Sequence, residues 1–384
     1  MRVSGFTSTG SKRPLSLFGG GYDDLPHRMT RSAGSRVWDE HGREYLDFIS
    51  ALGAVGLGYG HPHVLRAAVD AMERGGIGPL APEDEELLAA ELVAVMPWME
   101  ELRFLKTGAE AVAAAVRLAR TATGRDRVLG CGYHGWLDWC SPGPGVPGAV
   151  SALYGMLPFN DPEESAAVIR QTGAGLACVV VEPVIDAAPS EEWLRTLREE
   201  TWSVGAILVY DEIKTGFRVA EGGAAMRWGG EPDLVVLGKA LANGFPLAAV
   251  GGRADVMRRA NDTWISSTMA TDFVSFAAAR ATVAAVREVG LPARLAETGG
   301  TLFEGLQGLA ARHADRIVAS GIPEMCYLRF ADEVDSQRAA QGCARRGLLF
   351  KRSAYNFVTL AHTEADVMRA LGILDEVLRE MAWR

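Results

Sequence analysis

The sequence predicts an α/β protein in which a large, mostly parallel sheet is followed by a smaller α+β domain. Between about residues 64 and 250, helix-period segments alternate with short apolar runs, the order expected of βαβ units whose sheet is buried on both faces. After residue 273, two long helical patterns precede short strands and a final helix. The length of 384 residues is sufficient for two packed domains.

The elements follow in order along the chain. The amino-terminal stretch WDEHGREYLDF alternates around His41 and Gly42, which predicts a hairpin that we expect to pack near the second domain. The alternating part gives the helices HVLRAAVDAM, EELLAAELVAVM and AVAAAVRLART, and the strands LRFL, RVLG, CVVVEPV, AILVYDE, LVVLGK and LAAVGG. We therefore expect an amino-terminal segment over 1–52, a large ligand-binding domain over 53–274 and a small domain over 275–384.

Residues 139–160 interrupt this alternation with four prolines, which predicts a loop that could serve as an active-site lid. The carboxyl-terminal part gives the long helix FAAARATVAAVREVG, a second long helix after it, and the strands MCYLRF, LLFK and NFVTLA. A helix over residues 364–381 ends the chain.

Composition excludes several classes of function. A formal net charge of -9 argues against a nucleic-acid or anionic-membrane partner, since either would require a basic face. The five cysteines have no close spacing, so we expect reduced thiols and no metal site. No apolar run is long enough to span a bilayer. These features predict a cytoplasmic protein that acts on small molecules.

Two strand ends carry the residues that first indicate chemistry. Asp211 ends the run AILVYDE and Lys239 ends the run LVVLGK, so both belong at the carboxyl edge of the sheet, where α/β proteins bind their ligands. A lysine that attacks carbonyl groups and an acid that protonates a pyridine nitrogen are the minimal set for an electron-sink cofactor. On position alone, a surface lysine and a capping aspartate remain alternatives.

The neighbouring motifs favour the chemical interpretation. The segment DEIKTGFRVAEGGAAMRWGGEPDLVVLGKALANGFPLAAVGGR resembles the class III aminotransferases of the fold-type I pyridoxal-phosphate enzymes, most of all the glutamate-1-semialdehyde 2,1-aminomutase branch. The resemblance covers nearly the whole chain, through GSRVWDEHGREYLDF, GYGHPHV, KTGAEAVAAAVRLARTATGRDRV, GYHGWLD, LPFND, VVVEPV and TLAHTEADV. It implies a fold-type I enzyme with pyridoxal 5'-phosphate in the large domain.

The resemblance assigns roles around the cofactor ring. It implies that Lys239 forms the Schiff base, Asp211 pairs with the pyridine nitrogen, and Ile213 packs against the ring. Tyr133 would stack on the ring, with His134 beside it, although without the family these two would be ordinary packing residues. Glu182 ends the strand CVVVE and matches a family acid near the phenolic oxygen; a helix-capping glutamate is the alternative.

The turn Thr107-Gly108-Ala109 is the predicted phosphate site. It precedes a clean helical pattern, so backbone N–H groups and the helix dipole favour an anion there. The family usually has Ser or Thr where this chain has Ala109, which removes a hydroxyl but no backbone donor. We expect phosphate binding to survive the change, while an ordinary helix start is the alternative.

Two further predictions concern assembly and substrate. Thr268 matches a family threonine that reaches the phosphate of the neighbouring subunit, which implies a homodimer, although Asp272-Phe273 replaces the usual Asn-Pro nearby. Arg352 could clamp a substrate carboxylate with a bidentate guanidinium, or be a solvated charge at a strand end. Trp136 could shape the pocket, or simply pack.

We expect an aminotransferase that moves an amino group from an amino donor to a ketone or aldehyde acceptor by a ping-pong mechanism. The alternatives are intramolecular transfer as in the aminomutase, racemisation or epimerisation, and a cofactor-binding protein without turnover. Transfer between two molecules is favoured because residues 139–160 and 322–347 are shortened against the aminomutase branch and Ala187 replaces an asparagine. An open pocket could admit an oxidised sugar or cyclitol; the donor, acceptor and pathway are not specified by the sequence.

Overall fold

The computed structural model describes residues 2–352 and 354–383, and its contacts divide the chain into two compact units. Unit 1 combines Met1–His61 with Ala293–Arg384, and unit 2 is Pro62–Pro292. The sequence-based boundaries, after residues 52 and 274, lie earlier in the chain at both points. One reason is that α11 (Phe273–Val289) packs against α3 (Pro62–Glu73) and α4 (Glu83–Val95), which holds it in unit 2.

Unit 2 is built on a seven-stranded sheet in the order β4-β10-β9-β8-β7-β5-β6. The strand β10 is antiparallel to both of its neighbours, and the remaining pairs are parallel. The strands are β4 (Glu101–Leu105), β5 (Arg127–Cys131), β6 (Tyr154–Met156), β7 (Leu176–Val181), β8 (Ile207–Asp211), β9 (Leu234–Leu237) and β10 (Ala248–Gly252). The predicted mostly parallel sheet is confirmed.

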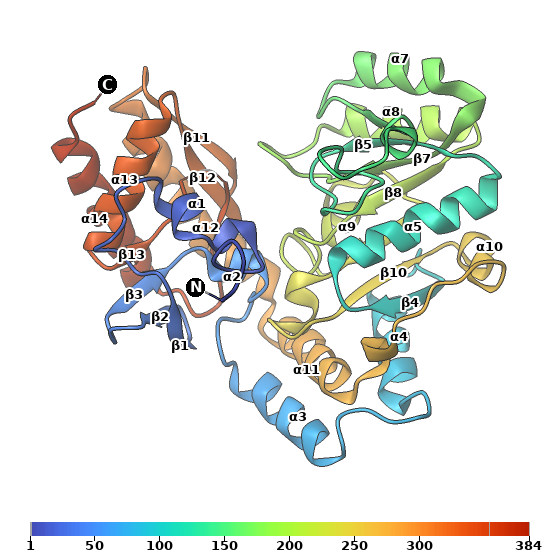
Figure 1. The fold of residues 1–384 in the computed structure, drawn as a ribbon, viewed down its shortest axis with the longest axis horizontal. Helices are drawn as coiled ribbons and strands as arrows, with labels where there is room; N and C mark the ends of the chain where they lie inside the picture. Colours follow the sequence, from blue (N-terminus) through green and yellow to red (C-terminus); the bar gives the residue numbers. More distant parts are fainter. Residues whose placement is uncertain (1, 353, 384) are drawn as a thin grey trace. The chain divides into compact units, whose positions relative to one another are not determined.

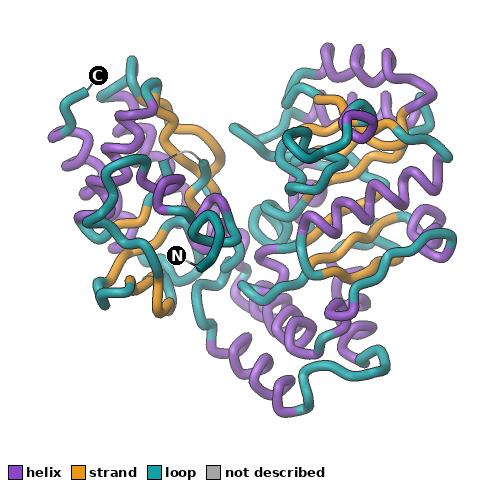
Figure 2. The backbone as a smooth tube through the Cα atoms, viewed as in Figure 1, coloured by secondary structure: helices purple, strands orange, loops and turns teal. Residues whose placement is uncertain are grey.

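Helices cover both faces of this sheet (Figures 1 and 2). In β7, Cys178 and Val180 pack with α5 (Gly108–Thr123), whereas Val179 and Val181 pack with α7 (Pro162–Thr172) and α8 (Glu191–Ser203). Because side chains alternate along a strand, a run such as LACVVV can be apolar throughout only when both faces are buried. The central strands β7, β8 and β9 are buried at every residue.

The segment 139–160, predicted as a loop, contains α6 (Gly148–Ser151) and the edge strand β6. β6 pairs in parallel with β5, and its Tyr154 crosses the backbone of Gly130 so closely that a Cβ there would lie 2.2 Å from the Tyr154 hydroxyl. A three-residue strand has too little periodicity to be recognised in the sequence. The rest of unit 2 comprises η2 (Gly173–Gly175), α9 (Gly223–Trp228), η3 (Lys239–Ala242), α10 (Ala254–Met257), η4 (Arg258–Asn261) and η5 (Thr268–Thr271).

Unit 1 contains two small sheets. β1 (Met29–Ala33), β2 (Arg36–Asp39), β3 (Glu44–Asp47) and β13 (Leu348–Leu349) form the first, and β2 with β3 is the predicted hairpin. The second joins β11 (Ile317–Ile322), β12 (Met325–Phe330) and β14 (Asn356–Phe357). The helices are η1 (Gly10–Lys12), α1 (Pro14–Phe18), α2 (Ser50–Gly53), α12 (Leu291–Ala311), α13 (Glu333–Arg345) and α14 (Glu364–Glu380). No helix within the described residues is long and apolar enough to cross a membrane.

Candidate active site

The residues predicted to bind the cofactor gather along one edge of the unit 2 sheet. The strands β4, β5, β7, β8 and β9 all run in the same direction, so their carboxyl ends share that edge. Each of the following lies at one of these ends or directly after it: Thr107, Tyr133, His134, Glu182, Asp211 and Lys239. The edge therefore brings together a lysine, two acids and an aromatic ring.

Lys239 opens η3, immediately after β9, and has a left-handed backbone with φ of 45°. This conformation costs a non-glycine residue of order 1–3 kcal/mol, and such strain concentrates at functional sites. The pKa of Lys239 is lowered to about 8, first by burial of the amine and next by the positive charge of Lys214. A lysine with this pKa has far more of the nucleophilic, unprotonated amine at neutral pH than an exposed lysine.

Asp211 is held by a buried histidine. Its Oδ2 lies 2.9 Å from His134 Nδ1, and both side chains are almost fully enclosed. Because a carboxylate can only accept, the hydrogen belongs on Nδ1. His134 Nε2 is buried without a hydrogen-bond partner among the described residues. Asp211 Oδ1 accepts the backbone N–H of Ile213 at 3.3 Å, so the orientation of the carboxylate is fixed from two sides.

Glu182 links the loop after β5 to a second lysine. Its Oε2 accepts the backbone N–H of Tyr133 at 2.9 Å, and its Oε1 lies 2.9 Å from the ammonium of Lys214. Gly132 has φ of +106°, and a Cβ there would meet Glu182 Oε2 at 2.5 Å, so a side chain at this position would disrupt the arrangement. Lys214 was not among the residues predicted from the sequence, although a lysine three positions after the strand-end acid in DEIKTGF was an available signal.

Two aromatic side chains project from the same loop into open space. Tyr133 is 70% exposed and Trp136 is 73% exposed, which leaves both rings free to contact a ligand. Gly135, with φ of +106°, approaches Ala109 so closely that a Cβ there would lie 2.7 Å from the Ala109 Cβ. The loop of Tyr133 therefore packs against the first turn of α5.

The turn Thr107-Gly108-Ala109 forms the start of α5, as predicted from the sequence. Thr107 is the N-cap, and it exchanges hydrogen bonds with Glu110 in a capping box. The N–H groups of Gly108 and Ala109 have no acceptor within the helix, because they belong to its first turn. Gly108 packs closely against Ile213, because a Cβ built on Gly108 would lie 2.5 Å from Ile213 Cδ1. The anion-binding turn and the residue predicted to pack against the ring are thus immediate neighbours.

Thr268 begins η5 and is exposed, as is its neighbour Met269. Next to this turn, Asp272 caps α11 and accepts a hydrogen bond from Lys106, whose ammonium also donates to Ser275 Oγ at 3.0 Å. Burial lowers the pKa of Lys106 to about 8. Asp272, which stands where the family usually has an asparagine, therefore pairs with the half-buried Lys106.

Arg352 belongs to unit 1, where its guanidinium pairs with the carboxylate of Glu333 and lies 3.3 Å from Ser336 Oγ. Burial raises the pKa of Glu333, but the hydrogen bonds and charge of Arg352, together with hydrogen bonds from Gln337 and Ser336, outweigh it and lower the pKa overall. Arg352 thus has a partner on α13 within its own unit.

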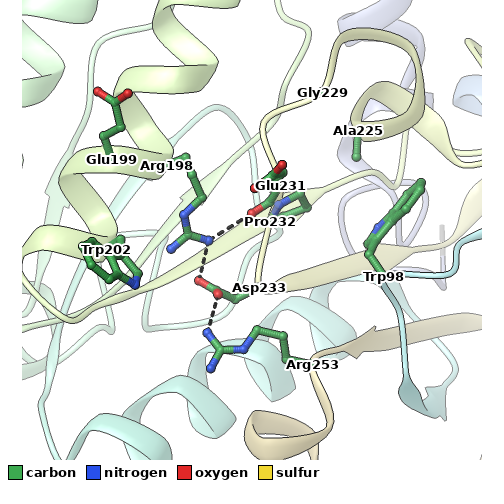
Figure 3. A pocket seen from close by; sticks show the side chains of 10 residues that line it. All are labelled: Trp98, Arg198, Glu199, Trp202, Ala225, Gly229, Glu231, Pro232, Asp233 and Arg253. Atoms are coloured by element: carbon green, nitrogen blue, oxygen red, sulfur yellow. Dashed lines mark hydrogen bonds and ion pairs between the residues drawn. The ribbon is translucent and has the colours of Figure 1, made fainter.

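A separate cavity of about 730 Å³ opens at the other edge of the sheet, beside the amino end of β9 (Figure 3). Arg198 and Arg253 both bind Asp233 there, at 3.0 and 2.7 Å. Trp98 and Trp202 also line the cavity. None of the residues predicted to bind the cofactor lines this cavity.

Comparisons with known proteins identify the family. The sequence model of the class-III aminotransferases matches residues 18–378. Glutamate-1-semialdehyde 2,1-aminomutase of Thermomicrobium roseum is 35% identical over 403 aligned positions, covering 93% of this chain and 92% of the relative. The enzyme of the same name from Neisseria meningitidis serogroup C is 33% identical over 420 positions, covering 99% and 98%.

The chain belongs to the class-III aminotransferase family.

Solved structures extend the likeness. The internal aldimine form of the Sphingopyxis FumI protein superimposes with a TM-score of 0.88 at 28% identity, covering 94% of this chain and 92% of that one. A β-phenylalanine aminotransferase from Variovorax paradoxus gives a TM-score of 0.83 at 27% identity, covering 94% and 90%. This class-III aminotransferase thus has the fold-type I architecture that the sequence predicted, and its cofactor is pyridoxal 5'-phosphate.

The residues present fit that cofactor. A basic amine, a carboxylate directed by a buried histidine, an exposed aromatic ring and a helix start with unpaired N–H groups lie along one edge. No group of three or more ligating side chains within residues 2–352 and 354–383 could hold a metal ion. The set is therefore suited to a planar, phosphate-bearing aldehyde.

Proposed function

We propose that this class-III aminotransferase moves an amino group from an amino donor to a separate ketone or aldehyde acceptor in two half-reactions, with Lys239 as the catalytic lysine. The observation that carries the proposal is the position of Lys239 and Asp211 at the carboxyl ends of adjacent strands, with the pKa of the lysine lowered to about 8. Bound pyridoxal 5'-phosphate supplies the carbon that exchanges the amino group and a ring that accepts the electron pair.

Lys239 has two tasks in this proposal. Its unprotonated Nζ would hold the cofactor, and it would also serve as the base that takes a proton from the donor carbon. A base works best when its pKa lies near the working pH, which the lowered pKa of Lys239 satisfies. The left-handed backbone at Lys239 is the kind of local strain that is retained at functional sites.

The remaining residues hold and orient. Asp211, oriented by His134 at 2.9 Å, would keep a proton on the pyridine nitrogen. Tyr133 would cover one face of the ring and Ile213 the other, while the backbone of Gly108 and Ala109 would bind the phosphate. Trp136, exposed next to Tyr133, would contact the acceptor. A role for Arg352 in binding a substrate carboxylate would require it to exchange Glu333 for the substrate.

Intramolecular transfer, as in the aminomutases, is the second candidate, and the 33–35% identity to proteins of that name favours it. Chain length favours transfer between molecules. The alignment to the Neisseria relative spans 420 positions and this chain has 384 residues, so the relative carries segments that are missing here. A mutase must retain its intermediate between half-reactions, which requires a lid that stays closed. Shortening at residues 139–160 and 322–347, as expected from the sequence, would support a more open site.

We also propose a homodimer that acts in the cytoplasm. The helix α3 exposes an apolar stripe formed by Leu65, Val69 and Met72, which are 50%, 41% and 53% exposed and lie at helical spacing. Leu80, in the loop after this helix, is 81% exposed. Contiguous exposed apolar surface of this kind marks an interface. Thr268 would reach the phosphate of the neighbouring subunit.

The test supplies nitrogen-15-labelled amino donors to the purified enzyme together with a panel of carbonyl acceptors that includes oxidised sugars and cyclitols. We expect mass spectrometry to find the label in an acceptor product. Glutamate-1-semialdehyde is offered in parallel. Its efficient conversion to 5-aminolevulinate without uptake of label from any donor would replace our proposal with the mutase.

A further inference from the structure

The mechanism proposed above leaves one buried lysine without a task. Lys214 lies in the loop after β8, and its ammonium sits 2.9 Å from Glu182 Oε1 with side-chain exposures of 9% and 8%. Burying two charges costs several kcal/mol for each ion before their mutual attraction repays it. A methionine of similar length would fill the same space at no such cost. The charge of Lys214 therefore calls for an explanation beyond packing.

The groups around Lys239 define what that charge does. Burial is the largest cause of the lowered pKa of Lys239, and the positive charge of Lys214 is the next. Glu182 and Asp211 act in the opposite direction, and the fully buried Arg218 acts in the same direction as Lys214. The geometry agrees, because a Cβ at Gly238 would lie 3.6 Å from Ile213, so Lys239 and Lys214 directly follow two residues that contact each other at the ends of the paired strands β9 and β8. Lys214 is the strongest of these four charged neighbours.

Cys131, at the carboxyl end of β5, does not supply a competing charge. Burial raises the pKa of the Cys131 thiol to about 12, with Glu182 raising it further, so this cysteine stays neutral at physiological pH. His134 faces Asp211 through Nδ1, and the nearby Tyr133 contributes its backbone N–H to Glu182. Lys214 and Glu182 therefore form the adjustable pair of the cluster, one residue disfavouring and the other favouring a charge on Lys239.

Glu182 also fixes the position of Lys214. Its two oxygens are divided between the backbone of Tyr133 and the ammonium of Lys214, so the acid is anchored at the end of β7 while it holds the cation. A charge held at a fixed place acts on its neighbours without any reorganisation when a proton moves.

We propose that Lys214, anchored by Glu182, is a positioning residue whose ammonium group disfavours a second positive charge on Lys239 and so keeps the catalytic amine ready to react at neutral pH. The inference deepens the proposed function and rests on the role assigned there to Lys239. It makes Lys214 a determinant of the pH range of the enzyme, although Lys214 itself exchanges no proton with the substrate.

The experiment measures the protonation of Lys239 in the cofactor-free protein. Acetic anhydride is applied in trace amounts across a pH series, and mass spectrometry follows the acetylation of the peptide that carries Lys239. In Lys214→Met we expect the midpoint of reactivity to move to higher pH by about one unit, an approximately tenfold loss of unprotonated amine at neutral pH. Lys214→Arg keeps the charge and should restore a midpoint close to that of the unchanged protein.

A second variant controls for the possibility that Lys214→Met misfolds. Lys214→Met leaves Glu182 buried without its cation, which could destabilise the loop. The double variant Lys214→Met with Glu182→Gln removes both charges, so its midpoint should also rise, though less than in the single variant because Glu182 no longer favours the charged amine. Circular dichroism verifies the fold of each protein. An unchanged midpoint in whichever of these two variants folds, or an equal shift in Lys214→Met and Lys214→Arg, overturns the proposal.

The assignment of Lys239 is tested separately. Borohydride is added to the cofactor-loaded protein, and peptide mapping identifies the lysine that is labelled. If the label falls on a different lysine, the proposed function fails, whatever the acetylation of Lys239 shows. If the label falls on Lys239 and the midpoint ignores Lys214, only the role of Lys214 fails.

Discussion

The two edges of the large sheet each bury an aspartate, but they surround it differently. At the amino edge, Asp233 binds Arg253 at 2.7 Å, Arg198 at 3.0 Å and the backbone N–H of Leu208 at 2.8 Å. At the carboxyl edge, Asp211 has His134 at 2.9 Å and the weaker contact to Ile213 N at 3.3 Å. The first carboxylate is enclosed by two permanent cations, whereas the second is oriented by a titratable ring.

The difference separates a structural acid from a chemical one. Arginine stays charged at any physiological pH, so Asp233 has two permanent cationic partners that join β9, α8 and the residue following β10. The carboxyl edge instead gathers Lys239, Lys214 and Glu182 with a strained backbone at Lys239. Charges that are only partly matched can respond to a ligand, which is the arrangement found at reactive sites.

Removing the amine from the carboxyl edge should have the largest effect on turnover. In Lys239→Ala, turnover should fall by about 10³-fold or more, because the variant loses both the attachment point and the base. Kinetics of amine transfer and borohydride mapping check the result. A variant that keeps turnover within tenfold of the parent would remove Lys239 from the mechanism.

The next largest effect should come from the acid at the same edge. Asp211→Asn keeps the shape of the side chain but loses the negative charge that favours a protonated pyridine nitrogen, so turnover should fall by about 10²-fold. Thermal unfolding serves as the control and should change little. Activity equal to that of the parent would show that Asp211 only supports the loop.

In the proposed homodimer, the carboxyl edge of one subunit receives Thr268 from the other, whereas no such contribution is proposed for the amino edge. Val69→Asp places a charge in the middle of the exposed stripe on α3 and should convert the dimer to a monomer in sedimentation. Activity should fall with it, because Thr268 of the neighbouring subunit would no longer reach the phosphate. Met368→Asp, on the exposed surface of α14, is the matched control and should leave the dimer intact. A monomeric, fully active parent contradicts the proposal.

The pH dependence of cofactor uptake tests whether the pKa of the amine at the carboxyl edge is lowered. Only the unprotonated amine of Lys239 reacts, and its pKa is lowered to about 8 from 10.5. The rate at which the cofactor-free protein takes up pyridoxal 5'-phosphate should therefore rise about tenfold per pH unit below 8 and then level off. A rate that continues to rise towards pH 10 would mean that the amine is not perturbed. Stopped-flow absorbance measures the uptake.

The smallest effect on catalysis should come from the amino edge. Asp233→Asn leaves two arginines around a neutral side chain, and the loss of this largely buried pairing should lower the free energy of unfolding by about 2 kcal/mol, a value reduced because Arg253 is half exposed. The kcat of the folded enzyme should stay within about twofold. Chemical denaturation and steady-state kinetics test the two parts, and a large loss of kcat would erase the distinction between the edges.

Local pattern was sufficient for much of the fold. The continuous apolar runs of β7, β8 and β9 predicted buried parallel strands because only a sheet covered on both faces accommodates them. Asp211 and Lys239 stood at strand ends in the sequence and lie there in the structure. Motif order then identified the family and hence the cofactor. The pattern failed to reveal the three-residue strand β6, which pairs with β5, and it also missed β1 and β11, which pair with β2 and β12.

The residue types at the reactive edge follow from the sequence, whereas the contacts among them depend on the tertiary structure. His134 meets Asp211 across β5 and β8, and Glu182 meets Lys214 from the ends of β7 and β8, at separations along the chain where no periodicity carries information. The same holds for Arg352, whose pairing with Glu333 follows from the packing of α13. Burial and charge set the pKa of Lys239, and both are properties of neighbours that only folding assembles.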